Sequence, residues 1–296
     1  MANSLSAFNA QVWSQAIIRN LDRINVMLPH TNRQWDGVLN SVGDTVQVRT
    51  LGSVTTGSYS KGQTISYQGL SPVKEALTVS DSVYFAFQVD DIDKVQNDHD
   101  ALMLYAQRAA VAINNAVEDK ILSSYASCLA ANQITNSGSP ITLTSTTAGT
   151  SVYDNLVLAR ENLSKQNVPL NQPRWVVVNP ATASLLLKDT VHFIRSTDLG
   201  DKVAQMGTVD GLPARPGFLG MCAGFEVYES NAVPSDASGK YLVYGDDMAI
   251  AYVAQLQEVE QIRLQDTFAW AIRGLLLHDV KVFAEASKRL GYIYAA

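Results

Sequence analysis

Residues 50–69 read TLGSVTTGSYSKGQTISYQG, a stretch that needs support from elsewhere in the molecule. Gly52, Gly57 and Gly62 divide it, serine and threonine fill most of it, and Lys61 is its only charged residue. Its apolar side chains are too few to form a core, and its charge is too low for a soluble disordered tail. The composition therefore indicates an extended segment that lies against another surface.

The segments on either side of this stretch have the period of β-strands. Val42, Val46 and Val48 share one face before it, and Leu77 and Val79 share one face after it. We therefore expect two strands that run out to a glycine-rich tip and return. An isolated two-stranded ribbon is only marginally stable in water, so something has to cover it.

The composition bounds the class of protein. The 296 residues allow roughly two domains, and 47% of them are hydrophobic, which is enough for a substantial core. A net charge of −6 argues against a basic nucleic-acid-binding face. Cys128 and Cys222 are the only cysteines, so we expect no disulfide framework and a reducing compartment. The start, MANSLSAFNAQVWSQ, predicts no signal peptide, and no apolar run is long enough to predict a membrane span.

After the ribbon, the apolar period changes from that of a strand to that of a helix. Residues 81–91, DSVYFAFQVDD, alternate and predict a half-buried strand. Its apolar residues share one face: Val83, Phe85, Phe87 and Val89. From 97 to 131 apolar residues recur at helical spacing, which predicts a helix about 50 Å long with a polar opposite face that includes Glu118. We expect this helix to be a spine, because one small globule cannot cover its length.

A loop with glycine and proline, residues 135–151, separates this helix from a second unit. Ser151 and Asp154 resemble a capping box that opens a helix. The elements expected from there are helices at 152–166 and 181–189 and strands at 174–178, 225–229, 241–245 and 248–256. They predict a compact α+β domain of ordinary size.

Residues 258–295 return to strand character. Phe268, Trp270 and Ile272 alternate, and Val280 and Val282 do the same. These strands need a sheet partner, and the strand at 83–89 is the obvious candidate. We therefore expect the first domain to be discontinuous.

No catalytic or metal-binding motif is present in the sequence. The P-loop, the nucleophile elbow and the H-E-x-x-H motif are all missing, and the four histidines are scattered. Residues 90–100, DDIDKVQNDHD, lack the central glycine and final glutamate of a calcium loop. We interpret them as a strand end followed by the acidic first turn of the spine helix, where acids are favourable.

The remaining cysteine, histidine and basic residues that could have a catalytic or DNA-binding role are better interpreted as structural or surface residues. Cys222 has no histidine or lysine beside it in the sequence to lower its pKa. His99 and His278 are interpreted as surface or boundary residues, and Lys288 with Arg289 is too small a basic cluster for a DNA groove. We expect no catalytic residue, no cofactor, no metal and no enzyme.

The order of these elements resembles the major capsid protein of tailed bacteriophages. That α+β fold, the Hong Kong-type capsid fold, is shared with encapsulin shells and herpesvirus capsid floors. The resemblance covers essentially the whole chain. Three short segments are also similar to phage coat proteins: WVVVNPATASLLL, GFEVYESNAVP and FAWAIRGLLLHDVKVF.

The resemblance implies a division of the chain. Residues 1–40 would be an N-terminal arm and 41–82 an extended β-hairpin loop. The peripheral domain, with the long spine helix on a small sheet, would consist of 83–137 and 258–296. The axial domain would be 141–257.

The resemblance also implies a function, that of a major capsid protein that self-assembles into the icosahedral head of a tailed double-stranded DNA phage. The protein would be assembled in the host cytoplasm and located in the virion. Its partners would be other copies in pentamers and hexamers, a separate scaffolding protein, a portal, decoration proteins and packaged DNA contacted weakly and without sequence preference. In this fold the extended loop lies across the neighbouring subunit, which implies intersubunit contacts at Thr56, Ser58, Tyr59, Lys61, Gln63, Ile65 and Tyr67.

Two alternatives stay open at this point: an encapsulin-like compartment shell with an enzyme cargo, and a soluble enzyme with its site in the axial domain.

A separate question concerns Lys61, because some capsids of this fold crosslink a loop lysine to an asparagine of a neighbour's peripheral domain. The last asparagine of this chain is Asn231, so the C-terminal segment offers no acceptor. We expect Lys61 to be an ordinary charge at a loop tip.

Overall fold

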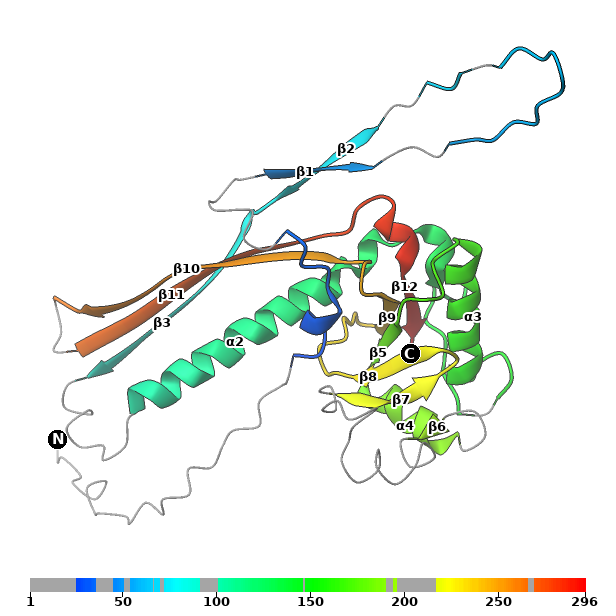
Figure 1. Cartoon of the computed structure of the whole chain (residues 1–296). Helices are drawn as coiled ribbons and strands as arrows, with labels where there is room; N and C mark the ends of the chain where they lie inside the picture. The colour runs from blue at the N-terminus through cyan, green and yellow to red at the C-terminus, as the bar shows by residue number, and fades with distance from the viewer. Residues whose placement is uncertain are drawn as a thin grey trace, which may run out of the picture.

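The structure is a computed structural model. The residues that it describes are 25–35, 45–50, 54–65, 67–69, 72–90, 101–145, 147–189, 194–195, 217–265 and 269–296. Figure 1 shows a rounded body, a long slab of three strands with one helix beside it, and a hairpin that projects from the slab. The described strands form three sheets, of seven, three and two strands.

The body is built on a mixed sheet in the order β4-β12-β9-β5-β8-β7-β6. Its strands are β4 (Gln133–Ile134), β5 (Arg174–Val178), β6 (Ile194–Arg195), β7 (Phe218–Cys222), β8 (Phe225–Glu229), β9 (Lys240–Asp246) and β12 (Leu290–Ala295). All five residues of β5, RWVVV, are buried, as expected of a short apolar strand at the centre of a sheet. This sheet corresponds to the predicted α+β domain.

Two helices of the body begin where the sequence predicts them. Helix α3 (Val152–Lys165) starts after Ser151, whose hydroxyl accepts a hydrogen bond from the Asp154 N–H. In a full capping box the Asp154 carboxylate would accept a hydrogen bond from the N–H of the N-cap, Ser151. Here it accepts instead from the Gly149 N–H, two residues before the N-cap, at 2.7 Å. Helix α4 (Pro180–Lys188) has Asn179 as its N-cap and proline at its first position.

The slab is an antiparallel sheet in the order β10-β11-β3, with strands β3 (Asp81–Asp90), β10 (Ala251–Arg263) and β11 (Ala269–Lys281). The prediction that the strand at 83–89 pairs with the C-terminal segment is therefore confirmed, with Phe85 opposite Gly274. Phe268 lies outside the described residues. Helix α2 (Ala101–Ser123) packs against β3 and β11 (Figure 1).

The spine helix ends earlier than the sequence predicts. Helix α2 stops at Ser123, and two 3₁₀ turns follow it, η3 (Ser124–Ser127) and η4 (Ala130–Asn132). The hydroxyls of Ser123 and Ser124 each donate at 2.7 Å to carbonyls of the preceding turn, those of Lys120 and Ile121. Serine competes with the helical backbone in this way, which ends the helix where a periodic apolar pattern continues. The described 23 residues are about 35 Å long.

The C-terminal strand lies in a different sheet from the one predicted. The sequence places all of 258–296 with the slab, whereas β12 pairs with β9 and β4 near one edge of the body's sheet. A 3₁₀ turn, η5 (Ala286–Arg289), redirects the chain after β11. Strand β4 also belongs to this sheet, although 133–134 fall within the predicted first segment of the peripheral domain. Strand β12 instead extends the body's sheet, because Leu290–Ala295 pair antiparallel with β9 from Gly245 back to Lys240.

The hairpin consists of β1 (Thr45–Thr50) and β2 (Val73–Thr78), paired with Val46 opposite Leu77. Its base is covered by the same chain, because Leu77 and Val79 are buried with Val253, Leu277 and Phe283 in a small second core. Half-buried Val46, Val48 and Trp35 complete that core. The expected ribbon is confirmed, but its base needs no second molecule.

Candidate functional site

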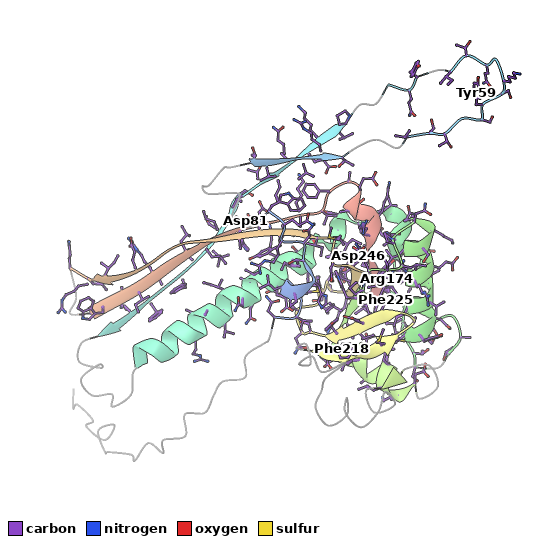
Figure 2. The ribbon with its side chains drawn as sticks, in the orientation of Figure 1. Tyr59, Asp81, Arg174, Phe218, Phe225 and Asp246 are labelled. Carbon is purple, nitrogen blue, oxygen red and sulfur yellow. The ribbon has the colours of Figure 1, made fainter. Side chains whose placement is uncertain are left out.

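The seven residues predicted to make intersubunit contacts all lie in the loop that joins β1 to β2. The described part of this loop, 54–65 and 67–69, is exposed throughout. Figure 2 labels Tyr59 at the far end of the loop, well away from the body. The structure therefore brings together Thr56, Ser58, Tyr59, Lys61, Gln63, Ile65 and Tyr67 on one projecting segment.

A few local hydrogen bonds shape this loop. At its tip the Gln63 N–H donates to the Ser60 carbonyl at 3.0 Å, and the Ser60 N–H donates to the Gln63 side chain at 3.1 Å. Gly62 has a φ of 87°, which glycine adopts without strain. Nearer the base, the Gln68 side chain accepts from the N–H and the hydroxyl of Thr55. These bonds hold the two limbs together without burying apolar surface.

Large apolar side chains on this loop lie in water. Val54 is 69% exposed, Ile65 62% and Tyr67 95%. Contiguous exposed apolar surface on a folded chain marks a surface that another molecule covers. Because the loop has almost no charge, covering it carries little desolvation cost.

A second exposed feature lies on the outer face of the slab, opposite α2. Tyr84 of β3 is 76% exposed there. A shallow hollow of about 670 Å³ is lined by Tyr84, Phe85, Ala86, Glu260, Arg273, Gly274 and Leu275. Arg273 donates two hydrogen bonds to the Glu260 carboxylate, at 2.8 and 2.5 Å. Sequence reasoning missed this hollow, although the alternation of β3 already predicts an outward Tyr84.

The segment 25–35, predicted as part of an arm, is built into the core. Val26, Met27 and His30 are buried, and residues Leu28–His30 form the 3₁₀ turn η2. The Val26 N–H donates at 2.9 Å to the carboxylate of Glu118, which is fully buried on α2. The sequence places Glu118 on the polar face of the helix; that placement is wrong because the N-terminal segment and Ser230 cover it.

His30 fixes the same segment to the body. Its Nδ1 lies 2.9 Å from the Asp247 carboxylate, and its ring lies 4.6 Å from that of Tyr228. Beyond it, Asn32 exchanges two backbone hydrogen bonds with Ile250 and Tyr252 at the start of β10. Residues 25–32 are therefore an anchor between the spine helix, the body and the slab.

The cysteines are unsuited to nucleophilic chemistry. Burial raises the pKa of the Cys128 thiol to about 11 and that of Cys222 to about 12. A thiol is a nucleophile only when it is ionised, so both stay inert near neutral pH.

His278 is buried, which corrects its interpretation as a surface or boundary residue. It lies on β11 against Tyr252, and burial lowers its pKa, although Asp81 and Asp279 act in the opposite direction. His99 and most of 90–100 lie outside the described residues.

The basic residues near the C-terminus are engaged within the chain. Arg289 donates at 2.7 Å to the fully buried carboxylate of Asp246, whose pKa is raised mainly by burial. Lys288 pairs with Glu285 at 2.8 Å. The first pair joins the turn after β11 to the sheet of the body, and the second lies within the turn. They form no open basic groove.

The described residues offer neither a metal-binding cluster nor a membrane-spanning helix. The described part of the chain contains no group of three or more histidine, cysteine or acidic side chains placed to hold a metal ion. Among the helices described, none combines the length and the apolar character needed to cross a membrane.

The whole architecture matches solved capsids. A chain from Mycobacterium phage Che8 is 24% identical to this protein. The match covers 97% of both chains and has a TM-score of 0.72. The capsid of the cyanophage P-SCSP1u is 15% identical over 100% of this chain and 95% of its own, with a TM-score of 0.71. The capsid of Ralstonia phage GP4 is 12% identical over 100% and 98%, with a TM-score of 0.70.

The sequence itself decides the family. No curated protein matches the chain. The model of the family described as phage capsid protein matches residues 78–287, which is most of the chain and includes the spine helix, the slab and the body except for β12. With the capsid fold along its full length and the family's sequence pattern over this range, the chain belongs to the phage capsid protein family.

Proposed function

We propose that this capsid protein builds closed shells of pentamers and hexamers around double-stranded DNA, with the projecting loop of each copy lying on a neighbour. The observation that carries the proposal is the projecting loop, on which Ile65 is 62% exposed and Tyr67 95% exposed. Burying such side chains against a second copy is worth about 1.5–3 kcal/mol each. The loop therefore stabilises a contact between subunits more than it stabilises the free subunit.

The structure has the parts that such an assembly needs. We assign the loop 41–82 to intersubunit contact, the body to the axial domain and the slab with α2 to the peripheral domain. The anchor 25–32 supports this division, because it fixes the slab to the body at the place where the two meet. The loop is then free to reach outward.

We also propose further partners for the assembled shell. A scaffolding protein, a portal and decoration proteins would act on the assembled shell. Packaged DNA would contact the wall weakly, which suits a chain of net charge −6 whose C-terminal basic residues are paired internally. We also propose that the protein has no enzymatic activity, and the raised thiol pKa values support this for the cysteines. The family match favours a phage capsid over the encapsulin-like shell and the soluble enzyme.

Negative-stain electron microscopy of the purified protein, alone and with a co-expressed scaffolding protein, tests the proposal. We expect closed particles of uniform diameter that contain nuclease-resistant DNA when they are isolated from a productive infection. A protein that stays monomeric at high concentration with its scaffold present would contradict the proposal. Particles filled with one host protein instead of DNA would support the encapsulin-like alternative.

A further inference from the structure

A buried histidine lies where the slab, the spine helix α2 and the base of the hairpin meet. His278 of β11 is 2% exposed, and neither nitrogen of its ring has a hydrogen-bond partner among the residues that the structure describes. Buried polar atoms of proteins are nearly always hydrogen-bonded, so an exception needs an explanation. A ring that leaves two buried nitrogens unsatisfied contributes little by packing alone. The groups that face this ring therefore decide what it does.

Two carboxylates and one ammonium group surround the ring. Asp81 of β3 lies directly opposite His278 in the antiparallel register, so both side chains are on the face of the slab that α2 covers. On that face, Lys120 of α2 forms an ion pair with Asp81. Asp279 follows on β11 and points to the other face. Its carboxylate accepts hydrogen bonds from the N–H and the hydroxyl of Ser80, at 3.1 and 2.8 Å.

These surroundings keep the ring neutral near neutral pH. Strand β10 contributes the phenol of Tyr252, which packs edge-on against the ring of His278 with the centroids 6.3 Å apart. Burial lowers the pKa of His278, and Lys120 acts in the same direction, while Asp81 and Asp279 oppose both. The ring therefore takes up a proton only when the solution is more acidic than its ordinary pKa of about 6.5.

A proton on His278 changes the balance at Asp81. An imidazolium ring has two donors and no acceptor, and the carboxylate across the strand pair is the acceptor on its own face. The new charge also repels the ammonium group of Lys120, more strongly in a partly buried site than in water. The Lys120 side chain is 41% exposed, so its ammonium group can turn into water when it loses its partner. The protonated ring and the lysine thus compete for one carboxylate.

We propose that His278 is a proton-operated latch: at neutral pH Lys120 holds the spine helix to β3 through Asp81, and on acidification His278 takes that carboxylate and releases the lysine. The residues after Lys120, Ile121 and Leu122, are buried in the core of the body. Asp81 begins β3, and Figure 2 labels it where the hairpin leaves the slab. Opening the latch therefore lets the slab and the hairpin turn relative to the body. This inference goes beyond the proposed function, because it concerns the free subunit and needs no shell.

Spin labels on the free subunit measure this movement. Gln88→Cys on the slab and Ala237→Cys on the body are both exposed, and the native cysteines are buried and stay unlabelled. We expect the distance between the two labels to change between about pH 7.5 and about pH 5, with a midpoint below about pH 6.5. A distance that does not depend on pH would overturn the inference.

Three variants of the labelled protein identify the groups. His278→Gln keeps a polar side chain that does not titrate, so it should keep the neutral-pH distance throughout. Lys120→Met removes the ammonium group and keeps the length of the chain, so it should show the acid distance already at about pH 7.5. The matched control is Lys165→Met, which removes an exposed ion pair with Glu161 far along the sequence from the latch and should respond to pH like the wild type. A His278→Gln protein that still responds with the wild-type midpoint would overturn the inference.

A proton NMR titration of the His278 ring tests the competition itself and does not depend on the size of the movement. The resonance is assigned by its absence in His278→Gln. We expect the pKa of His278 to be higher in Lys120→Met than in the wild type, because the variant lacks the ammonium group that opposes protonation. Lys120→Gln repeats the measurement if the methionine variant does not fold. Equal pKa values of His278 with and without the lysine charge would show that the two groups do not compete, which would overturn the latch and leave the proposed function intact.

Discussion

Gly291 shows how tightly the body is packed where β12 pairs with β9. A Cβ atom at this position would lie 2.4 Å from Cζ of Tyr244 and 2.6 Å from the Asn132 carbonyl oxygen. The Tyr244 hydroxyl donates to that same carbonyl at 2.7 Å, and both residues are fully buried. Strand β12, strand β9 and the turn η4, which are distant in the sequence, therefore meet at Gly291, where only a glycine leaves enough room.

Gly291→Ala should destabilise the free subunit. The added methyl group has to displace a buried ring and a backbone carbonyl, and overpacking of this kind costs about 1–3 kcal/mol. Urea denaturation of the unassembled subunit measures the effect. Gly57→Ala is the matched control, because a Cβ there meets nothing within 4 Å. Equal stability of the two variants would show that the contact around Gly291 can relax freely.

His278 predicts how stability depends on pH. Burial lowers its pKa in the folded chain, so the unfolded chain binds the proton more tightly. Its stabilising contribution is therefore complete above its ordinary pKa of about 6.5 and is lost as the pH falls below it. We expect the free energy of unfolding of the wild-type subunit to decrease between about pH 7.5 and pH 5 by more than that of His278→Leu. Parallel curves for the two proteins would exclude this residue as the cause.

At the scale of elements, the hairpin combines two different functions. Its base is held by its own chain through Leu77 and Val79, while its tip makes only local hydrogen bonds. The anchor 25–32 has the opposite character, since its backbone and side chains reach α2, β10 and the body. Removal of the tip should therefore affect assembly, and removal of the anchor should affect folding.

Replacing residues 52–67 by a short turn should leave a folded subunit that no longer forms stable shells. The melting temperature of the unassembled variant should stay within a few degrees of wild type, because the side chains that the structure describes in this segment, 54–65 and 67, are exposed. Differential scanning fluorimetry and electron microscopy of the same preparation measure the two effects. A large fall in melting temperature would mean that the loop packs within its own subunit.

The elements with a clear period were predictable from the sequence. The alternation of DSVYFAFQVD predicts β3 and its pairing with β11, and Ser151 and Asn179 mark the starts of α3 and α4. Other features depend on contacts that no local pattern encodes. Glu118 is buried because residue 26 folds back onto it, and β12 pairs with β9 of the body instead of with a strand of the slab. The predicted contact loop does project from the rest of the chain, with its described residues exposed, whereas its contact with a neighbour stays a prediction.

For the whole molecule, the shape determines how copies can meet. The slab and the hairpin reach away from the body in different directions, so each copy can offer a loop to one neighbour and an edge strand to another (Figure 1). In the proposed shell, many small contacts without covalent bonds would hold the copies together.

Mature shells should contain no covalent link through Lys61. The attack of a lysine on an amide needs a deprotonated amine in a dry site with an acceptor nearby, and Lys61 is exposed at the loop tip. Shells boiled in denaturant should give a single band near 32.1 kDa on a gel. A ladder of oligomers that disappears in Lys61→Ala would show that the lysine forms a crosslink after all.

The most direct test of the account is an electron cryomicroscopy map of the assembled protein in which residues 54–69 can be traced. The account predicts a closed shell in which this loop crosses to the adjacent copy and lies on its slab, with Ile65 and Tyr67 buried. A shell in which the loop folds back onto its own subunit, or projects into solvent without touching a neighbour, would contradict it.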